Sequence, residues 1–288
     1  MTDKKEKIGV LGAGTMGAGI AQVAAQAGFR TLLYDVSQEL VDKGLERIRS
    51  FLEGSRERGK LSAEQEAEIL GRLEGKTRLE DFAGCDLIIE AAPERLDLKR
   101  DIFRQVDGLC AETTLIATNT SSLSVTAIAA GARHPQRILG LHFFNPPPLM
   151  ALVEVVRGER TAPETVERAT ELVRQMGKTP VRAKDTPGFI VNRVARPFYN
   201  EALQILGSGD AQVETIDRVM KEAGNFRMGP FELMDLIGID INYAATESLY
   251  RSFFEDPRFR PSPLQQRMMM GGHLGRKTGR GFYVYDKK

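Results

Sequence analysis

A Gly-x-Gly-x-x-Gly pattern near the N-terminus is the first arrangement of residues in this chain whose spacing predicts a chemistry. It follows directly after the apolar run of residues 8–11, and an amphipathic segment opens after it. In a strand–turn–helix unit, the first glycine allows a tight turn, the second lets backbone N–H groups approach a pyrophosphate, and the third lets the helix pack closely on the strand. Glycines that serve only a tight turn are the alternative, but the flanking strand and helix patterns favour a dinucleotide site. The predicted cofactor-binding loop consists of Gly12, Gly14, Thr15, Met16 and Gly17.

Asp35 predicts which dinucleotide this loop binds. It ends the next strand-like run, about 20 residues beyond the glycines, where a carboxylate can accept hydrogen bonds from the ribose hydroxyls of adenosine. The same charge would repel a 2′-phosphate, and the following Val36 and Ser37 offer no arginine to bind one. We therefore expect NAD rather than NADP.

Three histidines are candidates for acid–base chemistry near neutral pH, because imidazole has an ordinary pKa of about 6.5. His142 ends the apolar run of residues 138–141, and ligands of parallel sheets bind at the carboxyl ends of the strands. A histidine at a strand end is equally often structural, so its position alone leaves both readings open. His134 precedes a proline in a polar loop and is expected to be solvated, while His273 lies among glycines without an evident partner.

The elements that must position these residues alternate along the first part of the chain. Short apolar runs are separated by long amphipathic segments, which is typical of a parallel sheet covered by helices on both faces. The predicted strands are residues 8–11, 31–34, 86–92, 115–118, 138–143, 152–156 and 179–183, and the main helical segments are residues 37–58, 96–109 and 163–176.

The pattern changes at the turn-prone residues 185–188. Beyond them the sequence reads as helices, at residues 189–206, 213–223, 231–250 and 264–270, with no clear strand until the last few residues. The predicted fold class is therefore α/β, with an N-terminal Rossmann-type dinucleotide-binding domain (residues 1–185) and a smaller all-helical C-terminal domain (residues 186–288).

Length and composition limit the possible functions. A chain of 288 residues suits two domains, and a formal net charge of +1 argues against a general nucleic-acid binder. The N-terminal residues show no apolar run long enough for a secretory signal or a membrane span. Cys85 and Cys110 are too few for a disulfide framework. A cytoplasmic protein that binds no nucleic acid, membrane or metal is expected.

Six blocks of the sequence resemble the signature blocks of the 3-hydroxyacyl-CoA dehydrogenase family. They occur in the family's order and spacing and cover essentially the whole chain, at residues 119–122, 140–146, 152–155, 185–193, 228–233 and 275–283. The resemblance implies an NAD-dependent oxidation of a (3S)-3-hydroxyacyl-CoA to the 3-oxoacyl-CoA.

The resemblance also implies a role for each catalytic residue. His142 would be the general base, and Glu154 would fix its tautomer and stabilise the imidazolium. Ser121 would hydrogen-bond the substrate's 3-oxygen, and Asn192 would position the acyl group. From spacing alone, Glu154 on its alternating run could instead face solvent, and Asn192 could be an ordinary amide on a helix face.

Further residues are assigned to the ligands in the same way. Glu94, Lys99, Asn119 and Lys277 would complete the cofactor site, although Glu94 and Lys99 would otherwise read as an ordinary charged helix start. Coenzyme A is anionic, and a basic segment in the family's corresponding position offers Arg58 and Lys60. Interleaved glutamates make a merely solvated face the competing reading.

The substrate and pathway stay open between related alternatives. The resemblance covers enzymes acting on 3-hydroxybutyryl-CoA and on 3-hydroxyadipyl-CoA, hence fatty-acid or phenylacetate-type degradation. A dehydrogenase of the 6-phosphogluconate type also carries such a glycine loop but relies on a catalytic lysine. A binding or structural protein that kept the fold, as certain lens crystallins did, is the non-enzyme alternative.

Apolar residues 233–241 and Met268 to Met270 predict a homodimer through the C-terminal domain.

Overall fold

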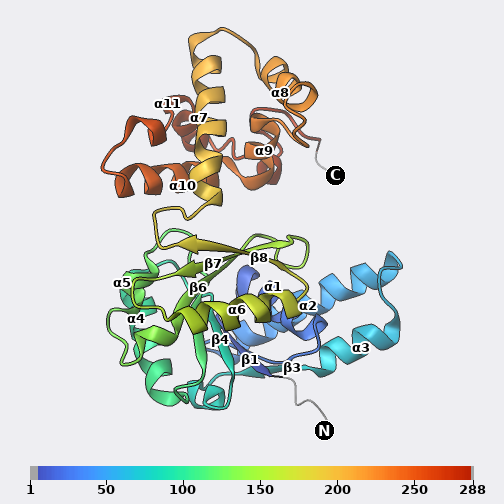
Figure 1. The fold of residues 1–288 in the computed structure, drawn as a ribbon. Coiled ribbons are helices and arrows are strands. Elements are labelled where there is room, and N and C mark those ends of the chain that lie inside the picture. Colours follow the sequence, from blue (N-terminus) through green and yellow to red (C-terminus); the bar gives the residue numbers. More distant parts are fainter. Residues whose placement is uncertain (1–5, 287–288) are drawn as a thin grey trace. The chain divides into compact units, whose positions relative to one another are not determined.

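The computed structural model describes residues 6–286, and the chain divides into two compact units (Figure 1). The first unit is Met1–Thr186 and the second is Pro187–Lys288. The division lies one residue beyond the expected domain limit at Asp185, within the turn-prone segment. Each unit has a hydrophobic core of its own.

A single eight-stranded sheet forms the centre of the first unit. Its strands are β1 (Lys7–Leu11), β2 (Arg30–Tyr34), β3 (Leu73–Lys76), β4 (Leu87–Glu90), β5 (Leu115–Thr118), β6 (Ile138–Phe143), β7 (Leu152–Arg157) and β8 (Thr179–Lys184). They lie in the order β3-β2-β1-β4-β5-β6-β7-β8. The order of the first six strands is that of a doubly wound dinucleotide-binding fold, which confirms the predicted Rossmann-type domain.

The strand β7 departs from the purely parallel sheet that the apolar runs predict. Every neighbouring pair is parallel except β6 and β7, which run antiparallel. Residues 144–151 connect these two strands, and this connection is too short for a parallel crossover, which needs a dozen residues or more. The parallel pattern of the preceding strands therefore does not extend to this pair.

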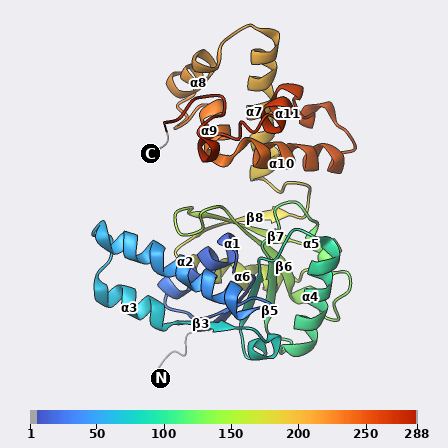
Figure 2. The ribbon, with the colours of Figure 1, turned by 180° about the vertical axis from the view of Figure 1, so that it is seen from behind.

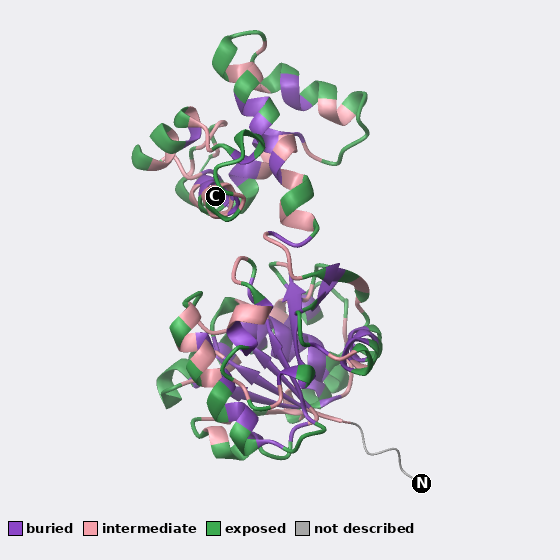
Figure 3. Cartoon of the chain, turned by 60° about the vertical axis from the view of Figure 1, so that its left-hand side comes forward, coloured by how far each residue is buried: buried purple, intermediate pink, exposed green. Residues whose placement is uncertain are grey.

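Helices cover both faces of the sheet (Figure 1 and Figure 2). They are α1 (Thr15–Gln26), α2 (Gln38–Glu57), α3 (Ala63–Gly71), α4 (Leu96–Leu109), α5 (Val125–Ala129) and α6 (Pro163–Gln175), with short 3₁₀ turns η1 (Leu79–Phe82) and η2 (Pro135–Arg137). Apolar residues of α1, α2, α3 and α6 form one core with the strands, and those of α4 and α5 form a second core. Leu87 and Ile89 belong to the first core and Ile88 to the second, as the alternation of side chains along a strand requires. The inner strands β1, β4, β5 and β6 are therefore buried on both faces (Figure 3), which explains their largely apolar sequences.

Besides the short helix α5 and the two 3₁₀ turns, the elements α3 and β3 of this unit have no counterpart among the predicted ones. The edge strand β3 reads Leu-Glu-Gly-Lys and is only partly buried, so it shows neither an apolar run nor a clean alternation. The helix α3 begins with a capping box in which Ser62 and Gln65 bond each other's backbone. That local signal was available in the sequence.

The second unit is helical. Its helices are α7 (Val191–Ser208), α8 (Val213–Glu222), α9 (Pro230–Ile237), α10 (Ile239–Ser252) and α11 (Pro263–Met270), with 3₁₀ turns η3 (Pro257–Phe259) and η4 (Arg276–Thr278). The single helix expected at residues 231–250 is wrong, because Gly238 adopts a φ of 105° and separates α9 from α10. A left-handed backbone of this kind favours glycine and cannot continue a helix. In addition, isolated bridges join Arg280 to Gly275 and Val284.

Among residues 6–286, no helix is both long and apolar enough to cross a membrane. The predicted cytoplasmic location stays a prediction.

Candidate active site

His142 and Glu154 form a buried pair on neighbouring strands. They lie directly opposite each other in the antiparallel register of β6 and β7, and His142 Nδ1 is 2.7 Å from Glu154 Oε2. The exposed fraction is 6% for the histidine and 0% for the glutamate, so Glu154 does not face solvent. With Nδ1 donating to the carboxylate, the ring is oriented and its other nitrogen, Nε2, is the one suited to accept a proton.

Asn119 ties the end of β5 to the end of β6. Its Oδ1 accepts a hydrogen bond of 2.8 Å from the backbone N–H of Phe143, the residue next to His142. The amide oxygen therefore helps to fix the strand end that carries the histidine. The family resemblance implies only a cofactor role for Asn119, so this structural contact is an additional one.

Glu94 organises the loop that carries Ser121. Its Oε1 accepts hydrogen bonds from the backbone N–H groups of Ser121 and Ser122, both 3.1 Å, and from the Ser122 and Thr120 hydroxyls. Burial favours a higher pKa for the Glu94 carboxyl. The hydrogen bonds from Thr120 and Ser122 and the charge of Lys99 outweigh this effect and lower that pKa below its usual value. Glu94 is therefore held as an anion beneath the serine loop.

Lys99 lies under the same loop with an exposed fraction of 1%. Its Nζ donates to Glu90 Oε1 at 2.6 Å and to the Ala92 carbonyl at 3.1 Å, and lies 3.3 Å from Glu94 Oε2. These three acceptors match the three donors of an ammonium group. Lys99 thereby connects two carboxylates within the protein.

Glu90, which the sequence analysis missed, completes this network. It is fully buried at the end of β4, where its carboxylate also accepts from the Ala92 backbone at 2.6 Å and from the Thr118 hydroxyl at 2.7 Å. A charged residue at the end of an otherwise apolar strand was the available signal. A fully buried carboxylate needs paired charge and hydrogen bonds, and Glu90 has both.

The glycine loop has the shape that a dinucleotide requires. Gly12 has a φ of 103°, and a Cβ there would lie 2.7 Å from the Ala91 carbonyl oxygen, so only glycine fits. At Gly14 a Cβ would meet nothing within 4 Å, which leaves the backbone at the start of α1 open on that side. Gly14 caps α1 without a side-chain hydrogen bond, as suits a helix start that binds a phosphate.

Asp35 lies beside this loop. Its Oδ2 accepts a hydrogen bond of 2.8 Å from the backbone of Ala13, and its Oδ1 accepts one of 2.8 Å from Val36. A carboxylate offers about four acceptor positions, so these bonds leave capacity for ribose hydroxyls. The residues present therefore fit a bound dinucleotide.

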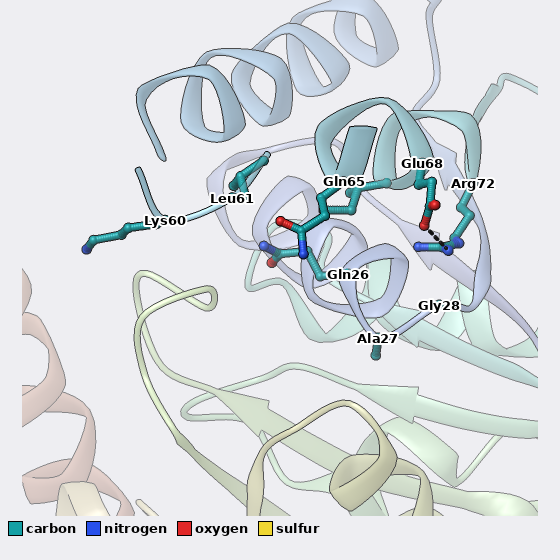
Figure 4. Close-up of a pocket in the computed structure, with 9 residues that line it drawn as sticks. Gln26, Ala27, Gly28, Lys60, Leu61, Gln65, Glu68 and Arg72 are labelled. Atoms are coloured by element: carbon teal, nitrogen blue, oxygen red, sulfur yellow. Dashed lines mark hydrogen bonds and ion pairs between the residues drawn. The ribbon is translucent and has the colours of Figure 1, made fainter. Parts of the chain in front are cut away.

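Arg58 and Lys60 lie at the end of α2 and in the turn after it, both exposed, on an arm formed by α2 and α3 (Figure 1). Arg56 pairs with Glu66 at 2.6 Å. In contrast, no carboxylate of the described residues lies within 4.0 Å of Arg58 or Lys60. Lys60 also borders a polar hollow on this arm, but its side chain points away from the other lining residues such as Gln65 (Figure 4).

The structure places Asn192 and Lys277 in the second unit. Asn192 is the second residue of α7 and is partly exposed. Lys277 Nζ bonds both carboxylate oxygens of Asp240, at 2.6 and 2.7 Å. This ion pair links η4 to α10, a contact that the sequence analysis did not foresee.

His134 is bound to protein groups rather than simply solvated, which corrects the sequence-based expectation. Its Nδ1 lies 3.2 Å from Asp107 Oδ1 and its Nε2 lies 3.3 Å from Glu112. Asp107 Oδ1 also accepts a hydrogen bond of 2.7 Å from Arg137 Nη2. The histidine therefore belongs to a structural polar cluster around Asp107, whose members lie far apart in the sequence.

Both cysteines are buried, and neither forms a disulfide. Burial raises the pKa of the Cys85 thiol to about 12, so this sulfur stays protonated and unreactive near neutral pH.

The doubly wound sheet, the glycine turn and the acidic end of β2 together define a dinucleotide-binding domain. Comparison with protein families agrees: residues 7–186 match the model described as "3-hydroxyacyl-CoA dehydrogenase, NAD binding domain", and residues 188–285 match "3-hydroxyacyl-CoA dehydrogenase, C-terminal domain". The chain belongs to the 3-hydroxyacyl-CoA dehydrogenase family. It is an oxidoreductase of that class, with NAD as its cofactor.

Individual relatives cover nearly the whole chain. The 3-hydroxyadipyl-CoA dehydrogenase of Escherichia coli is 50% identical over 96% of this chain, which spans 58% of that longer protein. The 3-hydroxybutyryl-CoA dehydrogenase of Clostridioides difficile is 43% identical over 98% of this chain and 100% of its own length. The crystal structure of (S)-3-hydroxybutyryl-CoA dehydrogenase from Ralstonia eutropha superimposes with a TM-score of 0.93 at 44% identity, covering 98% of this chain and 100% of that one.

Proposed function

We propose that this protein oxidises the 3-hydroxyl of a (3S)-3-hydroxyacyl-CoA to the 3-oxoacyl-CoA. The observation that carries the proposal is the buried His142–Glu154 pair, with its Nδ1–Oε2 distance of 2.7 Å. In a family of NAD-dependent oxidoreductases, an oriented imidazole at the carboxyl end of a sheet strand supplies the base that alcohol oxidation needs.

Each residue of the first unit has one task in this reaction. His142 takes the hydroxyl proton at Nε2, and Glu154 stabilises the imidazolium that forms. The Ser121 hydroxyl donates to the substrate's 3-oxygen in a loop held by Glu94. Bound NAD supplies the hydride acceptor. In the second unit, Asn192 positions the acyl group.

The cofactor assignments follow from the same arrangement. The loop of Gly12, Gly14, Thr15, Met16 and Gly17 holds the pyrophosphate, and Asp35 binds the adenosine ribose. Glu94 and Asn119 line the nicotinamide side. Lys99 acts through Glu94 because its own donors are used within the protein. Lys277 is assigned to the cofactor as well, and its ammonium also pairs with Asp240.

Arg58 and Lys60 bind the phosphates of coenzyme A. Both are exposed and lack a carboxylate within 4.0 Å among residues 6–286, so their charge is available to a phosphate. The acyl chain is short, as in 3-hydroxybutyryl-CoA or 3-hydroxyadipyl-CoA, which places the enzyme in fatty-acid or phenylacetate-type degradation.

The test is NADH formation by the purified protein with 3-hydroxybutyryl-CoA, 3-hydroxyadipyl-CoA and the corresponding free acids. We expect turnover of at least one thioester and none of the free acids. Activity with free 3-hydroxy acids alone would favour the 6-phosphogluconate-type alternative. Absence of any turnover by a protein that binds NAD would support the non-enzyme alternative.

A homodimer through the second unit is part of the proposal. Leu236, Ile241 and Met270 have exposed fractions of 50%, 55% and 78% and offer apolar surface to a second copy of the unit. Light scattering at micromolar concentration should give twice the chain mass of 31.9 kDa. A monomer mass would contradict the dimer without touching the catalytic assignments.

A further inference from the structure

Arg196 is a buried cation of the second unit to which nothing above assigns a function. It lies in the middle of α7 with an exposed fraction of 4%. No carboxylate of residues 6–286 lies within 4.0 Å of its guanidinium. A charged group so enclosed is costly unless it is paired, and arginine does not lose its proton in proteins.

Protein hydrogen bonds engage only one nitrogen of this guanidinium, Nη1. Nη1 donates to the Asn242 carbonyl at 3.0 Å and to the Thr246 hydroxyl at 3.1 Å, both on α10. The Tyr199 ring packs against the cation, with its centroid 4.9 Å from Cζ. These contacts explain why the side chain is ordered, but they supply no negative charge.

The opposite edge, formed by Nε and Nη2, has no protein acceptor among the described residues. Nε is fully buried and without a partner. Nη2 makes no hydrogen bond either, and it is not among the fully enclosed atoms, so it reaches the surface. Two parallel N–H groups on one edge are the donor pair that binds a carboxylate in a bidentate manner.

Neighbouring side chains add to this unsatisfied polar interior. Asn242 Nδ2 is a second buried donor without a partner, while Asn200 Oδ1 and Gln265 Oε1 are buried acceptors without one. Native interiors hold few such atoms. Arg196 Nε and these three atoms on other side chains make a set of four that a ligand or its water would satisfy.

The position of Arg196 on α7 relates it to the acyl group. Asn192, Arg196 and Asn200 are spaced by four residues and therefore share one face of the helix. Asn192 is the residue proposed to position the acyl group, and Arg196 follows it by four residues, about 6 Å along the helix axis. That step is comparable to the length of a short acyl chain.

We infer that Arg196 binds a carboxylate at the far end of the acyl chain, so that the substrate is a 3-hydroxyacyl-CoA with a second acid group, such as 3-hydroxyadipyl-CoA. The inference rests on the proposed function and decides between its two substrate alternatives. The competing explanation is purely structural: Arg196 ties α7 to α10 and meets no ligand.

The test compares two substrates of equal chain length, 3-hydroxyadipyl-CoA and 3-hydroxyhexanoyl-CoA, which has a methyl group in place of the carboxylate. We expect the wild-type kcat/KM to favour the diacid by about 10- to 100-fold, the usual strength of a charge-assisted hydrogen-bonded pair. An equal or reversed preference of the wild-type protein would overturn the inference, and this comparison needs no variant.

Two variants separate recognition from structure. Arg196→Met should abolish the preference for the diacid, and Arg196→Lys should retain part of it. Thr246→Val is the matched control, because it removes an acceptor of the same guanidinium while the cation stays. It should lower the melting temperature and leave the substrate preference intact. A preference unchanged in Arg196→Met would overturn the inference, whereas a wild-type protein that oxidises neither thioester would instead contradict the proposed function.

Discussion

Lys99 and Arg196 are both buried cations, one in each unit, and the protein surrounds them differently. Lys99 donates to a carbonyl and pairs with two carboxylates, whereas Arg196 meets a carbonyl, a hydroxyl and an aromatic ring but no acid. A cation that is paired with the protein's own carboxylates holds nearby groups in a fixed geometry. A cation without an internal counter-charge is suited to a ligand that brings the charge.

The same contrast separates the two halves of the proposed chemistry. In the first unit, His142 and Glu154 satisfy each other before any substrate binds. Such a preformed arrangement favours the transition state, because no reorganisation is needed during the reaction. In the second unit, polar atoms around Arg196 lack partners. That arrangement favours discrimination between substrates instead.

The largest expected effect follows from removing the preformed base. His142→Gln should lower kcat by about 10²- to 10⁴-fold, the usual contribution of a positioned acid–base group, while NAD binding persists. Glu154→Gln should be milder, because the amide still contacts the ring but cannot stabilise imidazolium. Steady-state kinetics and NAD titration check both variants. Near-normal turnover of His142→Gln would rule out the histidine as the base.

The next effect tests the comparison of the two cations directly. Lys99→Met should destabilise the fold by about 3–5 kcal/mol, because Glu90 is left as a buried unpaired carboxylate. Arg196→Met leaves no such charge behind and should cost clearly less, about 1–2 kcal/mol from lost hydrogen bonds. Urea unfolding of both variants gives the two free energies.

A double variant provides the control for this result. In Glu90→Gln/Lys99→Met the fully buried charge is gone and only the partly exposed Glu94 carboxylate has lost its lysine, so part of the stability should return. Equal losses for Lys99→Met and Arg196→Met, with no recovery in the double variant, would mean that the counter-charge does not distinguish the two sites.

The two units also differ in how much of their structure could be predicted from the sequence. The glycine loop and Asp35 were found because their signals are local and tied to one strand–turn–helix unit. The second unit was predicted as helical, yet the break at Gly238 was missed. The sequence alone does not show whether a single glycine within an apolar run adopts a positive φ.

The networks around the two cations were less accessible to prediction. Glu90 and Arg196 read as isolated charges, because their partners lie up to 50 positions away along the chain. The pairing of His142 with Glu154 required the antiparallel turn of β7, which the apolar pattern of β7 does not distinguish from a parallel strand. Resemblance to a family supplied that pair, while physical reading of the pattern left it open.

A smaller effect is expected at the cofactor loop. Asp35→Ala should weaken NAD binding by about 10-fold, because a charged acceptor of the ribose hydroxyls is lost. The preference for NAD over NADP should narrow as well, since the repulsion of a 2′-phosphate disappears. Kinetics with both cofactors check this, and Asp42→Ala, on the neighbouring exposed helix surface, is the control. Unchanged discrimination would show that Asp35 does not face the ribose.

The smallest effect is expected on the arm of the first unit, where charges are exposed rather than buried. Arg58→Glu or Lys60→Glu should raise KM for the acyl-CoA a few-fold with little change in kcat, because a phosphate contact stabilises ground state and transition state alike. The defect should shrink as salt rises, since exposed pairs are screened over about 8–10 Å near physiological ionic strength. The oxidation of an acyl-pantetheine, which lacks the nucleotide, should be affected by neither substitution.

Arg49→Glu is the matched control, because Arg49 already pairs with Glu46 on the same helix. If the side chains are merely solvated, both substrates keep wild-type constants at every salt concentration. Equal defects with acyl-CoA and acyl-pantetheine would show that the basic arm acts on something other than the nucleotide.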